Sequence, residues 1–107
     1  MLKYIKTTRG FAVTKEKILD FLRENKQLLK EKYYVTKIGL FGSYARDEAT
    51  AQSDIDIVIE TSKKDFFLKS DLQDFLEDAF HVKIDIGYLD SMREFYKRRI
   101  QKDILYV

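Results

Sequence analysis

The chain has 107 residues and carries 20 basic and 18 acidic side chains, a formal net charge of +2. This length fits a single domain, residues 1–107, and the near balance of charge gives no reason to expect direct nucleic-acid binding. There is no cysteine, which excludes disulfides and thiolate metal sites and suits the reducing cytoplasm, where we expect the protein. Apolar runs are far shorter than a membrane crossing, and the first residues lack the apolar core of a signal peptide, so no membrane partner is expected.

An arm and a helix are predicted first. Residues 1–13 show no clear pattern and are assigned to an N-terminal arm of undefined structure. Thr14 can cap a helix that begins at Lys15. Apolar side chains then recur at helical spacing to about Lys32, which predicts one amphipathic helix. Its apolar face consists of Ile18, Phe21, Leu22, Leu29 and Tyr33.

Two strands follow, joined by a short polar loop. Val35–Phe41 is predicted to be the first strand. Asp54–Glu60 places isoleucine at every second position, the pattern of a strand with one buried face. The connection between them, residues 47–53, is too short to contain a crossover helix, so we expect the two strands to be antiparallel.

A helix, a strand and a second helix are predicted in the remaining half. Phe66–Phe80 has helical apolar spacing, and Val82–Tyr88 is predicted to be the third strand. Ser91 can cap a last helix that runs to about Lys102. The chain ends in an apolar tail, Ile104–Val107. The fold class is therefore α+β, a small mixed β-sheet with helices packed on one face, which leaves the other face open for a cleft.

The candidate chemistry begins with two aspartates in the second strand. Side chains two residues apart in a strand share a face, so Asp54 and Asp56 lie together, about 6.5–7 Å apart at Cα. The isoleucines of the same strand take the opposite face. Unpaired carboxylates at this spacing repel one another and attract a cation, and Mg²⁺ prefers carboxylate and phosphate oxygens.

A third aspartate and a glycine–serine pair complete the candidate site. If the strand of Asp85 pairs beside that of Asp56, three carboxylates share a face and can hold two metal ions about 3.5–4 Å apart. Gly42 permits a sharp turn and a close approach of the backbone to a ligand. Ser43 adds a hydroxyl and can cap a short helix that runs through Arg46. The backbone N–H groups at the start of that helix would bind an anion.

Each of these residues also has a plainer interpretation. Asp54 or Asp56 alone could be a surface acid, and Asp85 alone could be a charge that protects an edge strand from pairing. Arg46 is a candidate phosphate ligand but could pair with the neighbouring acids instead. The basic side chains of the last helix form either a solvated face or a surface that steers an anionic partner. They are Arg93, Lys97, Arg98, Arg99 and Lys102.

The segments GSYAR, SDIDIVIE and KIDIG together resemble the signature of the nucleotidyltransferase superfamily that includes DNA polymerase beta and kanamycin nucleotidyltransferase. Within it the chain is most similar to the minimal nucleotidyltransferases, known as MNT or MntA proteins, from about Thr14 to the C-terminus. The resemblance implies a polymerase-beta-like fold. It also implies a Mg²⁺-dependent enzyme that transfers a nucleoside monophosphate from a nucleoside triphosphate to a hydroxyl, with two Mg²⁺ ions and with ATP as the substrate.

The resemblance further implies a role for each matched residue. Asp54 and Asp56 would bind both metal ions. Asp85 would bind the catalytic ion and help to deprotonate the acceptor hydroxyl. Gly42 and Ser43 would bind the β- and γ-phosphates of the nucleotide.

Relatives of this kind are generally paired with a small all-helical HEPN protein, a ribonuclease toxin. The resemblance therefore implies a type VII-like antitoxin that transfers AMP to a tyrosine of its toxin. The tail Ile104–Val107 and the basic last helix are the expected docking surfaces. Two alternatives stay open: a nucleotidyltransferase acting on a small hydroxylated molecule such as an aminoglycoside, and a non-catalytic antitoxin that binds its partner and acts by occlusion alone.

Overall fold

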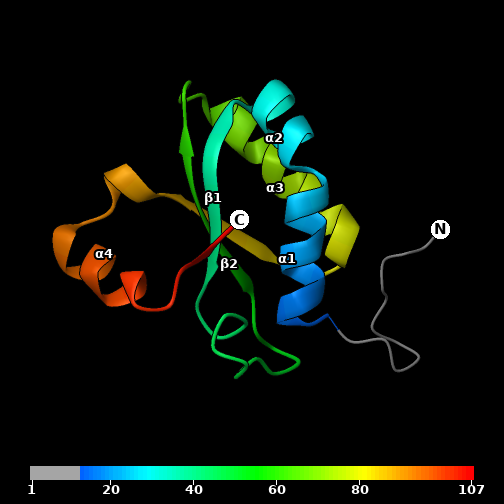
Figure 1. The fold of residues 1–107 in the computed structure, drawn as a ribbon, viewed down its shortest axis with the longest axis vertical. Helices are drawn as coiled ribbons and strands as arrows, with labels where there is room; N and C mark the ends of the chain where they lie inside the picture. Colours follow the sequence, from blue (N-terminus) through cyan, green and yellow to red (C-terminus); the bar gives the residue numbers. More distant parts are fainter. Residues whose placement is uncertain (1–12) are drawn as a thin grey trace.

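A four-stranded mixed sheet organises the computed structural model, which describes residues 13–107 (Figure 1). The strand order is β3-β2-β1-β4. β1 (Val35–Phe41) pairs antiparallel with β2 (Ile55–Thr61), and β2 pairs parallel with β3 (Ile84–Tyr88). The mixed sheet and the antiparallel first pair confirm the prediction. Most of the predicted N-terminal arm, residues 1–12, lies outside the described residues.

Two short helices stand where a single helix is predicted. Thr14 caps α1 (Lys15–Glu24) as expected, and its side chain accepts a hydrogen bond from a backbone N–H of the first turn at 3.2 Å. The helix ends before Asn25, and α2 (Lys26–Tyr33) follows. The side-chain amide of Asn25 donates to the carbonyl of Phe21 at 2.8 Å and so competes with the regular helical hydrogen bond. The prediction of one uninterrupted helix is therefore wrong.

The main core lies between the sheet and the helices α1, α2 and α3 (Phe66–Phe80), which cover the same face of the sheet (Figure 1). The isoleucines of β2 point into this core, as their alternation predicts, and none is more than 2 % exposed. Among residues 13–107, no helix combines the length and apolarity that a bilayer-spanning helix requires. Central residues of the core are Ile18, Leu22, Leu29, Ile55, Ile57, Ile59, Leu72 and Leu76.

The opposite face of the sheet is partly covered by the C-terminal part of the chain. A 3₁₀ turn, η1 (Leu89–Ser91), leads to α4 (Glu94–Gln101), and a second, smaller apolar cluster joins both to the sheet. Figure 1 shows α4 on the far side of the sheet from α1, α2 and α3. The expectation of an open face therefore holds only where η1 and α4 leave the sheet uncovered. The second cluster is formed by Phe41, Val58, Leu89 and Ile100.

The last helix begins later than predicted. The two residues after Ser91 are extended, so α4 starts at Glu94 and Ser91 does not cap it. The reason is a contact with the loop before α3. Lys64 forms an ion pair with Asp90 at 2.9 Å and donates a hydrogen bond to Ser91 Oγ at 3.4 Å, so η1 is held in place by a residue that is distant in sequence.

The apolar tail is a strand of the sheet. β4 (Leu105–Tyr106) pairs antiparallel with Gly39 and Leu40 of β1. Gly39 makes this approach possible, because a Cβ there would lie 2.7 Å from Ile104 Cγ2 and 3.0 Å from Tyr106 Cδ1. The tail thus completes the sheet of its own chain as an edge strand on which Tyr106 is 41 % exposed, and its role as a docking surface stays a prediction.

We expect Gly39→Val to lower the free energy of unfolding by about 1–3 kcal/mol, because the added side chain overpacks the contact with β4. Denaturant titration of the full chain measures the change. Thr36→Ser, at an exposed position of the same strand, keeps the hydroxyl that donates to the carbonyl of Glu60. It is the control and should stay within about 0.5 kcal/mol of the wild type. Equal unfolding midpoints for the two variants would contradict the importance of the β1–β4 approach.

Candidate active site

The parallel pairing of β2 with β3 sets two carboxylates side by side. Asp56 and Asp85 are direct register partners, and each lies between buried isoleucines of its own strand. Partnered residues of adjacent strands point to the same face, and neighbouring strands lie about 4.8 Å apart. Asp54 directly precedes β2, and its charge acts on Asp56. The structure thus brings the three predicted aspartates together on the side of the sheet that faces away from the main core.

Asp56 is the electrostatic centre of this group. Its carboxyl is half-buried, and burial raises its pKa to about 6, with the negative charges of Asp85 and Asp54 acting in the same direction. The positive charge of Arg46 opposes this rise in pKa only in part. At neutral pH the site therefore holds like charges that the chain does not fully neutralise, and a cation from solution would relieve their repulsion.

Gly42 places the backbone of the glycine–serine turn directly against Asp56. Its φ of +79° lies in the left-handed region, where glycine is favoured. A Cβ at Gly42 would lie only 2.1 Å from Oδ2 of Asp56. The preceding residue, Phe41, is the register partner of Asp56 on β1. Both the backbone conformation and the close approach therefore require glycine at this position.

The glycine–serine turn contains backbone hydrogen bonds but not the predicted short helix. The N–H groups of Arg46 and Glu48 donate to carbonyls four and five residues earlier, at 3.2 and 2.8 Å. The turn ends at Asp47, which has a left-handed φ of 60° and forms an ion pair with Lys15 at 2.8 Å. This left-handed residue stops helical propagation, so the prediction that Ser43 caps a helix is wrong.

The start of the turn still offers donors to an anion. Within residues 13–107, the backbone N–H groups of Ser43 and Tyr44 donate no hydrogen bond. Successive N–H groups of a turn can form a concave anion site without a helix. The predicted phosphate contact of Gly42 and Ser43 therefore depends on the turn itself, and it stays a prediction.

Arg46 is held by two carboxylates outside the aspartate group. Its Nε donates to Glu48 at 2.9 Å, and a terminal nitrogen of the guanidinium donates to Asp103 at 3.0 Å. The sequence left open whether Arg46 binds phosphate or pairs with a neighbouring acid, and the ion pair with Glu48 is the second of these. Asp103 was missed, because it is 57 positions away and no local pattern signals the contact. A phosphate role for Arg46 stays a prediction.

The three aspartates do not form a closed metal cage as they stand. Within residues 13–107, no group of three or more His, Cys, Asp or Glu side chains is arranged to hold a metal ion. Carboxylates that repel one another are expected to spread apart without a cation between them. Their chemistry nevertheless fits Mg²⁺, which binds proteins through one or two carboxylates and completes its octahedron with phosphate oxygens and water.

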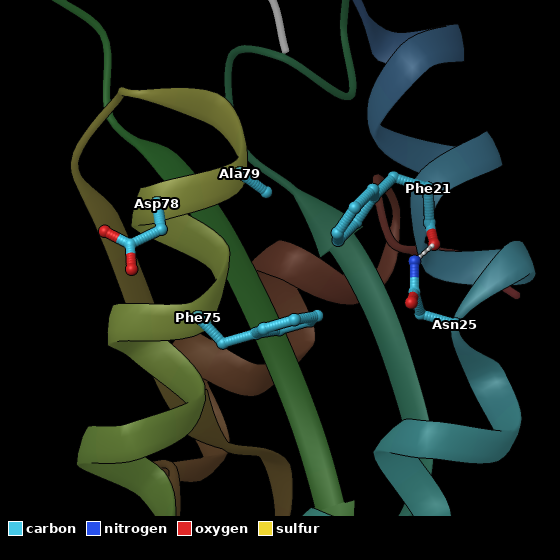
Figure 2. A pocket seen from close by; sticks show the side chains of 5 residues that line it. All are labelled: Phe21, Asn25, Phe75, Asp78 and Ala79. Atoms are coloured by element: carbon cyan, nitrogen blue, oxygen red, sulfur yellow. Dashed lines mark hydrogen bonds between the residues drawn. The ribbon is translucent and has the colours of Figure 1, made fainter. Parts of the chain in front are cut away.

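A hollow of about 440 Å³ lies between α1 and α3, on the opposite side of the sheet from the aspartates. Figure 2 shows the rings of Phe21 and Phe75 at this hollow and the carboxylate of Asp78 turned away from it. The two ring centroids are 5.7 Å apart. The lining residues offer no positive charge to a triphosphate, so we assign the hollow to helix packing and not to nucleotide binding.

A mixed sheet that sets three aspartates on one face, beside a glycine–serine turn, is the arrangement of a nucleotidyltransferase domain. The family model described as "Nucleotidyltransferase domain" matches residues 16–107. The chain therefore belongs to the nucleotidyltransferase domain family, as the resemblance of its motifs predicts.

Known proteins support this assignment at two levels. A Methanocaldococcus jannaschii relative with the provisional name protein adenylyltransferase is 43% identical over 96 residues, which cover 88% of this chain and 98% of the relative. A solved structure provisionally described as a minimal nucleotidyltransferase has a TM-score of 0.72 at 22% identity, covering 87% of this chain and 95% of that one. A chain of a toxin–antitoxin crystal structure with AMP-PNP has a TM-score of 0.65 at 24% identity, covering 88% and 72%. The two structures confirm the fold.

Proposed function

We propose that the chain transfers AMP from ATP to a hydroxyl of a partner protein. The observation that carries the proposal is the register of Asp56 with Asp85, directly beside the backbone of Gly42. This arrangement supports roles for the aspartates as metal ligands and base and for the turn as a phosphate site, because the three elements lie close together. The provisional name of the Methanocaldococcus relative, protein adenylyltransferase, supports AMP as the transferred group.

The chemistry of the three aspartates suits Mg²⁺, and two bound ions would neutralise charge on the transferring phosphoryl group. Asp54 and Asp56 would hold both ions, and Asp85 would hold the catalytic one. Asp85 is exposed, so the acceptor hydroxyl can reach it and give up its proton there. The acceptor oxygen then forms a bond to the α-phosphorus, and the bond to the β-phosphate breaks to release pyrophosphate. The N–H groups after Gly42 would hold that leaving group.

The same proposal includes an antitoxin role in the cytoplasm. The chain would transfer AMP to a tyrosine of a HEPN-type toxin and silence it. The similarity in fold to a chain of a toxin–antitoxin structure supports this choice of partner.

One labelling experiment tests the proposal. The chain is incubated with Mg²⁺ and ATP labelled at the α-phosphate, together with either a HEPN toxin encoded beside it or an aminoglycoside. We expect label on the toxin, at tyrosine. Label on the aminoglycoside alone would favour a small-molecule enzyme. Inhibition of the toxin without label on any acceptor would favour a non-catalytic antitoxin and would overturn the proposed transfer.

Asp85→Asn tests the base role within this mechanism. We expect single-turnover transfer to slow about a hundredfold, while the affinity for ATP falls much less, because deprotonation belongs to the transition state. Rapid quench and nucleotide titration measure the two quantities separately. Asp71→Asn, an exposed acid on α3, is the control. Equal losses in transfer and in affinity would mean that Asp85 acts only as a ligand.

A further inference from the structure

The helix α4 presents an aromatic side chain between two arginines. Ile100 is the residue by which α4 is buried in the second apolar cluster. At about 100° per residue, the side chains of Phe95 and Arg98 lie on the opposite side of the helix from Ile100, and Arg99 lies beside Phe95 on the flank away from Arg98. Phe95 is 69 % exposed, and both arginines are exposed as well. The outward face of α4, defined by these three residues, is therefore an apolar anchor flanked by cations.

The segment that carries this outward face has an excess of positive charge. Residues 93–102 contain five basic side chains and one acidic side chain, a net charge of +4, whereas the whole chain carries +2. None of the ion pairs within residues 13–107 involves a basic side chain of this segment. Exposed aromatic and arginine side chains are the types enriched at the centres of protein interfaces.

The position of α4 relates this face to the candidate active site. Ile100 packs in one cluster with Val58 of β2. Val58 and Asp56 are two residues apart in the strand, so their side chains share a face at a Cα spacing of about 6.5–7 Å. The ion pair of Arg46 with Asp103 also ties the end of the α4 segment to the glycine–serine turn. A molecule bound on α4 would therefore lie on the side of the sheet that carries the aspartates.

We propose that the outward face of α4 is the docking surface for the acceptor protein, and that it binds an acidic surface with an apolar notch for Phe95. The proposal rests on the proposed function, whose acceptor it describes. Charge complementarity identifies the partner as acidic, and the protruding phenylalanine identifies it as a protein, because an apolar anchor is matched by a pocket. A nucleic acid would require a longer row of phosphate contacts than this short helix provides.

Binding of a fluorescent, glutamate-rich random copolymer that contains tyrosine tests the docking surface with the full chain. We expect Arg98→Glu with Arg99→Glu to weaken binding more than about tenfold. The matched control is Lys26→Glu with Lys30→Glu, at exposed positions of α2 on the other side of the sheet, which changes the net charge from +2 to −2 in the same way. The control should weaken binding less than about threefold. Phe95→Ser, which leaves the charge unchanged, should weaken it about tenfold.

Other outcomes separate the two proposals. Equal losses in the α2 and α4 double variants would mean that only net charge matters, and this would overturn the docking surface. Tighter binding of an oligothymidine that displaces the copolymer from the outward face would assign the face to nucleic acid instead. Transfer of AMP to N-acetyltyrosinamide should be the same in all α4 variants. If neither the wild type nor any variant transfers AMP to N-acetyltyrosinamide, while copolymer binding still depends on α4, the proposed transfer fails and the docking surface stands.

Discussion

Replacing Asp56 with asparagine is expected to abolish nucleotide transfer and to make the metal-free protein more stable at neutral pH. The amide cannot replace a charged ligand of Mg²⁺, so several kcal/mol of charge stabilisation is lost, a fall in rate of about 10³-fold or more. The gain in stability has a different origin. The Asp56 carboxylate is half-buried among the charges of Asp85 and Asp54, and asparagine removes that repulsion without changing the shape of the side chain.

The gain in stability from Asp56→Asn should depend on pH in a defined direction. The pKa of Asp56 is raised to about 6 in the folded chain, against about 3.9 for an unfolded aspartate. The folded state therefore binds more protons between these values, and the contribution of Asp56 to stability is full below about pH 4 and is lost as the pH rises through about 6. Because the group is partly exposed, solvent screening reduces the effect at neutral pH to about 1–2 kcal/mol.

Denaturant unfolding in the presence of EDTA, at about pH 4 and about pH 7.5, measures this difference. The variant should match the wild type at the lower pH and exceed it at the higher one. Asp71→Asn controls for the loss of an exposed acid and should show no such divergence. If Asp56→Asn instead destabilises the protein at both pH values, the aspartate is a structural residue and the interpretation of the site as a cation-seeking cluster fails.

The sequence predicts the part of this site that depends on strand periodicity. Asp54 and Asp56 alternate with isoleucines, and that alternation alone assigns the acids and the core to opposite faces. Asp85 was identified because it is also an acid between two isoleucines, and the crossover through α3 then allows its strand to pair parallel with β2. Local patterns were sufficient for the faces on which these acids lie, because that concerns neighbours along a strand. The register of Asp56 with Asp85 joins two distant strands, and the sequence indicated it only as a condition.

The features that the sequence did not predict depend on contacts between distant segments. Ser91 fails to cap α4 because Lys64 holds η1 from the loop before α3. The apolar tail is a strand because Gly39 leaves room for it on β1. Arg46 pairs with Asp103, far along the chain. In each case the residue types were compatible with the predicted local structure, and a partner with no fixed sequence spacing determined the outcome.

Gly42→Ala is expected to damage both the fold and the site. Alanine at φ +79° is strained by about 1–2 kcal/mol, and a Cβ placed 2.1 Å from Asp56 Oδ2 must displace the carboxylate or the turn. Overpacking adds about 1–3 kcal/mol, so the free energy of unfolding should fall by about 2–5 kcal/mol. Transfer by the folded fraction should fall more than about a hundredfold, because a shift of about 1 Å in a catalytic group is enough for such a loss.

A double-mutant cycle isolates the contact between Gly42 and Asp56. In an Asp56→Ala background the carboxyl group is gone and only the Cβ of residue 56, at 3.2 Å, still meets the added methyl. Gly42→Ala should then cost little more than the backbone strain of about 1–2 kcal/mol, and the difference from its cost in the wild type is the coupling energy. Gly87→Ala is the control for the loss of a glycine, since a Cβ there meets only the flexible end of Met92, at 2.8 Å. Additive costs in the cycle would mean that the turn does not abut the aspartate, and the phosphate site would then have no fixed position relative to the metal ligands.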